Sequence, residues 1–172
     1  YLAKSDTARE QSASKDEAVA AKAKKDAKTL LGQAEDQFQA AIKLKKDYAP
    51  AQYNLALAYD RQNQTKDAIK NMEIPRDLQP RDVGVYFQLG LLYYRDGQKD
   101  KAQGAFESAV ALSPNYSNAL WYLATIYEEK GDIVKALDLI KQVSKLNPGD
   151  QLVKARLDKL QSGKIDKANQ LP

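Results

Sequence analysis

The sequence predicts an all-α fold in which antiparallel helix pairs stack as an α-solenoid, with a long helix before the pairs and a capping helix after them. Three observations predict it. Ala, Leu, Lys and Gln are common while Gly and Pro are sparse, a composition that favours helix over strand. The same residue types recur every 34 residues through the middle of the chain. Near both ends, apolar residues recur at steps of three or four, as along one face of a helix.

The 34-residue recurrence holds in five columns across three copies. The first column is an apolar segment ending in tyrosine, at residues 55–59, 89–93 and 123–127. The others are Ala68, Ala102 and Ala136; Met72, Phe106 and Ile140; Leu78, Leu112 and Leu146; and Pro80, Pro114 and Pro148. We therefore expect three repeats, at residues 49–82, 83–116 and 117–150. One repeat cannot bury its apolar face alone, so stacking is expected to make a continuous core.

Each repeat is predicted to hold two helices joined by a short turn. A small residue follows the first leucine, where a neighbouring helix must approach closely: Ala56, Gly90 or Ala124. A turn residue that tolerates the left-handed conformation ends the first helix: Asn63, Gly97 or Gly131. The second helix crosses the first at an alanine and ends before a proline, which cannot continue it.

One second helix departs from the pattern. The late position that holds Ala109 and Val143 in two copies holds Pro75 in the first. A proline inside a helix removes a hydrogen bond and costs about 3 kcal/mol. We therefore expect the second helix of the first repeat to end early or bend near Ile74.

This helix–turn–helix pattern resembles the tetratricopeptide repeat family over residues 49–150. The resemblance implies a right-handed superhelix in which the first helices of successive repeats line a concave side. It also implies that ligand peptides lie along that side, so the expected function is a protein-interaction scaffold.

The C-terminal end is predicted to be a capping helix at residues 151–162, of the kind that keeps a solenoid soluble. Its apolar residues Leu152, Val153, Leu157 and Leu160 are expected to cover the last repeat. Ser162 and Gly163 should end it, and residues 163–172 are expected to form a flexible tail.

The N-terminal end departs from the repeat. Residues 33–48 match a second helix whose own first helix is missing, and residues 1–32 form a polar Ala/Lys-rich extension. Ser14 and Glu17 have the spacing of a capping box. A helical stripe follows, at Val19, Ala23, Ala27, Leu30, Ala34 and Phe38. We expect one helix from about Lys15 to Lys45, about 45 Å long, with Gly32 as its weak point. Partial disorder of the Ala/Lys stretch is the alternative, and residues 1–13 suit the severed end of a further first helix.

The candidate partner-binding residues follow from their offset to the core leucine of each first helix. They are Tyr53, Leu57, Asp60 and Arg61 in the first repeat; Phe87, Leu91, Tyr94 and Arg95 in the second; and Trp121, Thr125, Glu128 and Glu129 in the third. Aromatic residues and arginine most often carry binding energy at interfaces. This pattern favours a partner peptide or helix with apolar anchors. The competing interpretation is that the aromatic residues pack between helices.

Enzymatic activity is not expected. The chain has no cysteine and no histidine, which removes thiolate nucleophiles, disulfides and nearly all zinc or haem sites. A phosphate-binding glycine loop is missing, and the neighbouring Glu128 and Glu129 do not make a facing acid–base pair. We therefore expect no cofactor. A clamp for a C-terminal carboxylate, known in some members of the family, is also not expected, because the inner positions hold Tyr53, Leu57 and Leu91.

Charge distribution argues against specific nucleic-acid binding. Residues 49–150 carry twelve Lys/Arg against thirteen Asp/Glu, and the basic excess lies at the ends. Weak, salt-sensitive binding to nucleic acid is the most that this favours.

The location of the chain stays open at this level. No segment approaches the roughly 20 apolar residues of a membrane span, so membrane insertion is not expected within this segment. The chain begins at Tyr1 rather than Met, as a fragment would. The runs at residues 85–95 and 115–124 are similar to repeat tails of bacterial membrane proteins of the O-antigen-ligase type. The alternative function is therefore an extracytoplasmic, membrane-tethered scaffold domain of a larger bacterial envelope protein. The oligomeric state is not predicted.

Overall fold

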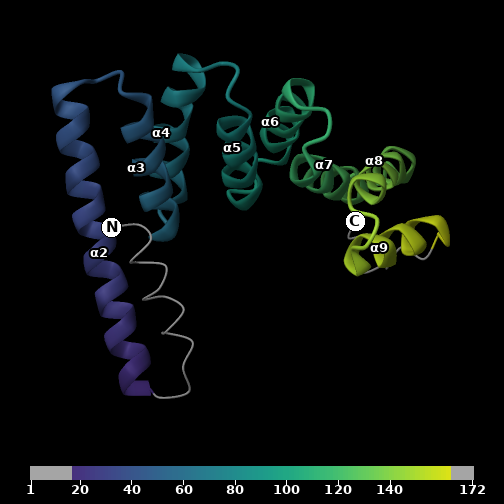
Figure 1. The fold of residues 1–172 in the computed structure, drawn as a ribbon, viewed down its shortest axis with the longest axis horizontal. Helices are drawn as coiled ribbons and strands as arrows, with labels where there is room; N and C mark the ends of the chain where they lie inside the picture. The colour runs from purple at the N-terminus through teal and green to yellow at the C-terminus, as the bar shows by residue number, and fades with distance from the viewer. Residues whose placement is uncertain (1–16, 164–172) are drawn as a thin grey trace. The chain divides into compact units, whose positions relative to one another are not determined.

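The computed structural model describes residues 17–163, and every regular element in that range is an α-helix (Figure 1). The chain divides into two compact units, residues 1–80 and 81–172. Their described parts, residues 17–80 and 81–163, are called the N-terminal unit and the C-terminal unit below. The predicted all-α fold of helix pairs is confirmed within each unit.

The N-terminal unit holds three helices: α2 (Glu17–Leu44), α3 (Ala49–Arg61) and α4 (Thr65–Leu78). The long helix is confirmed, since α2 has 28 residues and passes through Gly32 without a break. Its Ala/Lys-rich part is helical from Glu17 onward, so the disorder alternative is wrong there. The expected capping residue Ser14 and residues 1–13 lie outside the described residues, as does the tail from residue 164.

The buried stripe of α2 differs in detail from the predicted one. Ala23, Ala27 and Ala34 are buried as expected. Val19 is 47% exposed, and Leu31 rather than Leu30 occupies the fully buried position. With 3.6 residues per turn, residues three and four positions after Ala27 both lie near the same helix face. The buried residue here is the one four positions later, Leu31.

α4 shows that Pro75 does not end the helix, so the expected early end near Ile74 is wrong. The helix continues to Leu78, and the N–H of Gln79 donates to the carbonyl of Pro75. Pro75 lies in the last turn, where its missing N–H leaves only the carbonyl of Asn71 without its helical donor. Its ring is fully buried, which offsets that loss. A bend at this position stays a prediction.

The C-terminal unit holds five helices within the described residues: α5 (Val83–Arg95), α6 (Lys99–Leu112), α7 (Ser117–Glu129), α8 (Ile133–Leu146) and α9 (Gln151–Gln161). α5 pairs with α6 and α7 with α8, while α6 contacts α7 and α8 contacts α9. Aspartate side chains cap three helix starts by accepting from backbone N–H groups: Asp82, Asp132 and Asp150.

The predicted turns and close approaches are confirmed. Asn63, Gly97 and Gly131 have φ of 61°, 77° and 79°. A Cβ atom on Gly90 would lie 2.4 Å from a ring carbon of Phe106, so only glycine allows α5 to approach α6 this closely. The crossing alanines Ala68, Ala102 and Ala136 are fully buried.

The cap covers the last repeat with fewer residues than expected. Val153 and Leu160 are each 4% exposed and Leu157 packs partly against the core. Leu152 is 75% exposed, so its predicted covering role is wrong. Residues 153, 157 and 160 are spaced by four and three residues, so they lie on one face of the helix. Leu152 precedes Val153 by one residue and therefore points away from that face. Ser162 follows the last helical residue and Gly163 has φ 66°, which confirms the predicted end.

Candidate partner-binding surface

The twelve predicted residues lie on the first helices of the three repeats, four each on α3, α5 and α7. Ten are half-buried, Arg95 is exposed and Phe87 is buried. That these residues bind a partner stays a prediction. Their surroundings, however, divide them into residues that hold the fold together and residues left at the surface.

Phe87 belongs to the core and not to the surface. It is 8% exposed. Its ring centre lies 5.1 Å from that of Tyr116, 5.9 Å from that of Phe106 and 6.0 Å from that of Tyr122. Edge-to-face contacts at these distances stabilise aromatic clusters beyond their burial. The idea of Phe87 as a surface rung of an aromatic ladder is therefore corrected to a packing role.

Tyr94 and Glu129 join two successive first helices, α5 and α7. The Tyr94 hydroxyl donates to Oε1 of Glu129, and the Tyr94 ring lies 6.4 Å from that of Tyr122. Lys99 Nζ lies 3.0 Å from Oε2 of Glu129 as an ion pair without hydrogen-bond geometry. Burial, followed by the hydrogen bond to the Glu129 carboxylate, raises the pKa of Tyr94 to about 12. These two predicted residues thus fix the spacing of α5 and α7.

Arg156, on the capping helix α9, covers the predicted surface of α7. Its guanidinium carbon lies 4.2 Å from the ring centre of Trp121. Its Nε and Nη2 lie 2.7 and 2.6 Å from Oε1 of Glu128. Nη2 also donates to Oγ1 of Thr125 at 2.9 Å, and Nη1 donates to the carbonyl of Trp121 at 3.3 Å. Three of the four predicted residues on α7 are therefore engaged by one arginine.

Sequence reasoning missed Arg156, although a signal for it existed. Arg156 stands three residues after Val153 and four before Leu160, the two buried residues of α9. That spacing places it on the covered face of the helix. A charged residue at such a position needs partners, and α7 supplies them.

Two tyrosines at equivalent repeat positions bridge to the preceding second helix. Gln39 Nε2 donates to the Tyr59 hydroxyl at 3.3 Å, and that hydroxyl donates to Glu35 at 3.2 Å. Two repeats later the same contacts recur with the Gln and Glu positions exchanged: Gln103 donates to Tyr127 at 3.4 Å, and Tyr127 donates to Glu107 at 3.0 Å. Burial is the largest cause that raises the pKa of both tyrosines. These polar contacts are structural.

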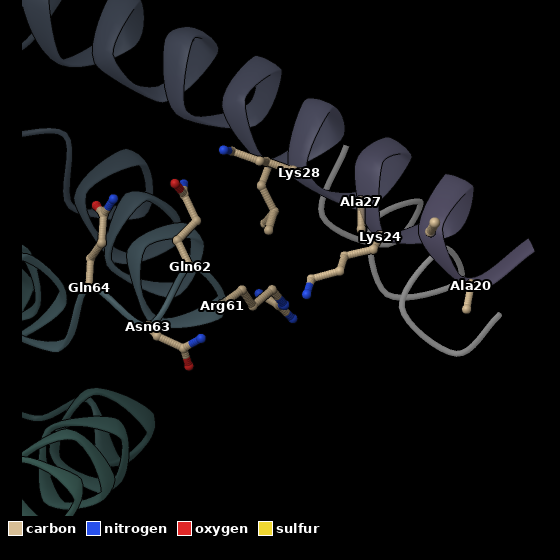
Figure 2. Close-up of a pocket in the computed structure, with 10 residues that line it drawn as sticks. Ala20, Lys24, Ala27, Lys28, Arg61, Gln62, Asn63 and Gln64 are labelled. Atoms are coloured by element: carbon tan, nitrogen blue, oxygen red, sulfur yellow. The ribbon is translucent and has the colours of Figure 1, made fainter. Parts of the chain in front are cut away.

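Arg61, whose place on the partner surface stays a prediction, lines a pocket in the N-terminal unit. The pocket has a volume of about 800 Å³ and lies between the N-terminal half of α2 and the turn after α3 (Figure 2). Its described lining residues are Ala20, Ala21, Lys24, Ala27, Lys28, Leu31, Arg61, Gln62, Asn63 and Gln64. Sequence reasoning did not find it, because α2 and the turn are far apart in the chain.

The described residues were also compared with the requirements for a metal site and for a membrane-spanning helix. Across residues 17–163, no group of three or more acidic side chains is placed to hold a metal ion. In the same range, none of the helices has the length and apolar character needed to cross a membrane.

The comparison with known proteins decides the family. The model of the tetratricopeptide repeat matches residues 27–71 and 87–150, more than half of the chain. The chain belongs to the tetratricopeptide repeat family. The match begins at residue 27, within α2, and the partial repeat expected at residues 33–48 stays a prediction.

Relatives and solved structures agree with this family. The chain is 38% identical over 96 residues to the uncharacterized protein ycf37 of Pyropia yezoensis, covering 53% of this chain and 52% of that protein. It therefore spans about half the length of this relative. The crystal structure of MamA superposes with a TM-score of 0.73 at 21% identity, covering 78% of each chain. The first repeat domain of Spaghetti (RPAP3), bound to an HSP90 peptide, superposes with a TM-score of 0.62 at 19% identity, covering 67% of this chain and 92% of that one.

Proposed function

We propose that this tetratricopeptide repeat protein is a non-catalytic scaffold that binds a peptide or helix of a partner protein through apolar anchors on its first helices. The observation that carries the proposal is the placement of Leu57 on α3 and Leu91 on α5. Both are half-buried, whereas Leu55 and Leu89, two residues earlier on the same helices, are 4% and 1% exposed in the core. α3 and α5 therefore each have one leucine in the core and a second leucine partly at the surface.

The surroundings of these leucines suit a peptide with apolar side chains. Tyr53 lies one turn before Leu57 and is half-buried as well, and the exposed Arg95 lies one turn after Leu91. Apolar residues with charged neighbours form the centre and rim of many interfaces. Binding of an HSP90 peptide by the similar repeat domain of Spaghetti supports a peptide ligand of some kind. The missing cysteine and histidine support the non-catalytic part of the proposal.

Arg156 narrows where the partner makes contact. Trp121, Thr125 and Glu128 have the Arg156 guanidinium group against them, which covers part of the predicted surface of α7. We therefore assign an apolar anchor to each unit by itself, Leu57 in the N-terminal unit and Leu91 in the C-terminal unit, and a smaller contribution to α7.

A displayed library of random 12-residue peptides, selected against the full chain, tests the proposal. Selected peptides should carry two or more apolar residues, and Leu57→Glu or Leu91→Glu should weaken their binding at least tenfold. Val134→Glu is the matched control, since Val134 is 73% exposed on the second helix α8. Circular dichroism confirms that each variant is folded. Failure to enrich any peptide, or equal binding by the leucine variants and the control, would falsify the proposal.

A further inference from the structure

α9 has the fewest buried residues among the described helices of the C-terminal unit (Figure 1). Only Val153 and Leu160 of its eleven residues are buried. A helix of this length is marginal in water by itself, so its packing on the last repeat keeps it helical. Elements with few buried apolar side chains open at a lower free energy than the rest of a protein. Within this unit we therefore expect α9 to open first.

The contact of α9 with α7 has the same place in the repeat as the contact of α7 with α5, but different residues make it. Arg156 stands 34 residues after Tyr122, and Trp121 stands 34 residues after Phe87. The rings of Tyr122 and Phe87 have their centres 6.0 Å apart. The guanidinium carbon of Arg156 lies 4.2 Å from the ring centre of Trp121. A pair of aromatic rings is thus replaced at α9 by a cation on an aromatic ring.

The second partner of the covering residue also changes from aromatic to charged. The ring of Tyr122 lies 6.4 Å from that of Tyr94, and the residue 34 positions after Tyr94 is Glu128, which pairs with Arg156. A tyrosine that leaves an aromatic cluster exposes apolar area to water, which is unfavourable. An arginine and a glutamate that separate both regain hydration, which offsets much of their lost attraction. The contact at α9 is therefore the one that exchanges more readily.

α7 supplies a set of partners that matches a guanidinium group. Trp121 gives a ring face, and Oε1 of Glu128 lies 2.7 and 2.6 Å from Nε and Nη2 of Arg156. Oγ1 of Thr125 accepts from Nη2 at 2.9 Å, and the carbonyl of Trp121 accepts from Nη1 at 3.3 Å. A planar guanidinium stacks and donates through several nitrogens at once, whereas the ammonium of lysine is a compact point charge. The set therefore suits an arginine side chain, whichever chain supplies it.

The charge of α7 narrows the ligand further. Glu129 is paired with Lys99 at 3.0 Å, so Glu128 is the carboxylate that Arg156 neutralises. An acidic segment or a nucleic acid carries the same sign of charge as Glu128 and is disfavoured there. A basic segment of a protein is favoured.

We infer that this surface of α7 is an arginine-binding site, in which Arg156 occupies the place of an arginine from a partner protein. The partner's arginine takes over the contacts with Trp121, Thr125 and Glu128, and α9 separates from α7 at this point. The capping helix thereby acts as an intramolecular competitor that weakens binding of the partner. The site does not involve the leucines of the proposed function, so the inference does not rest on that proposal.

The test uses the full chain and a fluorescent 12-residue peptide with two arginines among glycines and serines, followed by anisotropy at 50 mM salt. Arg156→Ala, which empties the site, should bind the peptide at least tenfold more tightly than the wild type. Lys154→Ala is the matched control, since it removes the same charge from an exposed position of α9, and it should stay within twofold of the wild type. A peptide with lysines in place of the arginines should bind Arg156→Ala at least fivefold more weakly.

Two further variants test the site and the competition separately. Glu128→Gln added to Arg156→Ala should remove the gain in affinity, because the carboxylate is lost. Arg156→Tyr introduces the residue type that Tyr122 has at the equivalent position, and its ring should pack on Trp121 and close the site. The peptide should then bind at least tenfold more weakly than to the wild type. Circular dichroism checks the folding of each variant, and the comparison of Arg156→Tyr with the wild type decides if Arg156→Ala does not fold.

Four results would overturn the inference. They are no saturable binding by folded Arg156→Ala, equal gains in this variant and in Lys154→Ala, equal binding of the lysine peptide, and equal binding by the wild type and Arg156→Tyr. Leu57→Ala should leave the affinity for the arginine peptide within twofold. The arginine site and the proposed function therefore fail or succeed independently.

Discussion

Arg156 lies over the ring of Trp121 with its guanidinium carbon 4.2 Å from the ring centre, and it pairs with Glu128 through two nitrogens. The arginine side chain is 13% exposed and the glutamate 25% exposed, so water screens this pair less than an ordinary surface pair. The capping helix is thereby attached to the last repeat by a charged group as well as by Val153 and Leu160.

Replacing Arg156 by alanine should destabilise the C-terminal unit by about 2 kcal/mol, because a stacked cation and several charge-assisted hydrogen bonds are lost together. Trp121 is the single tryptophan of the chain, so its fluorescence during urea unfolding reports this unit directly. Lys154→Ala, an exposed change on the same helix, is the control and should stay within about 0.5 kcal/mol of wild type. A midpoint for Arg156→Ala equal to that of the control would show that the stacked contact contributes nothing.

Gly90→Ala should destabilise the protein by about 1–3 kcal/mol, since its Cβ would stand 2.4 Å from the Phe106 ring and that ring is fully buried. Gly104→Ala on the neighbouring helix α6 should stabilise it by about 0.5–1 kcal/mol, because nothing lies within 4 Å of that Cβ and alanine favours helix. Thermal unfolding of the two variants measures the difference. Shifts of the same sign would contradict the close approach of α5 to α6.

Tyr94 should make stability depend on alkaline pH. Its folded-state pKa is raised to about 12 from an ordinary value of 10, so the folded state holds the phenolic proton more tightly than the unfolded state does. The stabilisation is fully present below pH 10 and is lost as pH rises from 10 to 12. Wild type should therefore lose up to about 2 kcal/mol relative to Tyr94→Phe over that interval. Urea unfolding of both proteins at pH 8, 10 and 11 measures it, and a constant difference would contradict the raised pKa of Tyr94.

The register of α9 can be tested at two adjacent residues. Val153→Ala should cost about 1–2 kcal/mol because Val153 is 4% exposed and packs beside Leu120 and Val143. Leu152→Ala should cost less than about 0.5 kcal/mol because Leu152 is 75% exposed. Chemical denaturation followed by Trp121 fluorescence gives both values. A larger loss at Leu152 than at Val153 would reverse the assignment of the buried face.

The sequence by itself determined the features that repeat. The 34-residue period located the turns at Asn63, Gly97 and Gly131, the close approach at Gly90 and the fully buried alanines. Each of these depends on neighbours within one repeat or on geometry that every repeat shares. Because the repeats stack in the same way, a residue type that recurs at one repeat position indicates the structural role of that position.

The tertiary structure decided which partly buried residues stay available. Phe87 and Trp121 occupy equivalent positions and Tyr94 lies two turns after Phe87, yet Phe87 packs in an aromatic cluster, Tyr94 bonds to Glu129 and Trp121 lies under Arg156. The repeat period indicates which face of its helix a residue lies on. It does not indicate which residue covers that face, because the covering residue is 28 to 35 positions away in the sequence. The same reason applies to Arg61, which lines one pocket with Lys24 and Lys28 although more than 30 residues separate them in the chain.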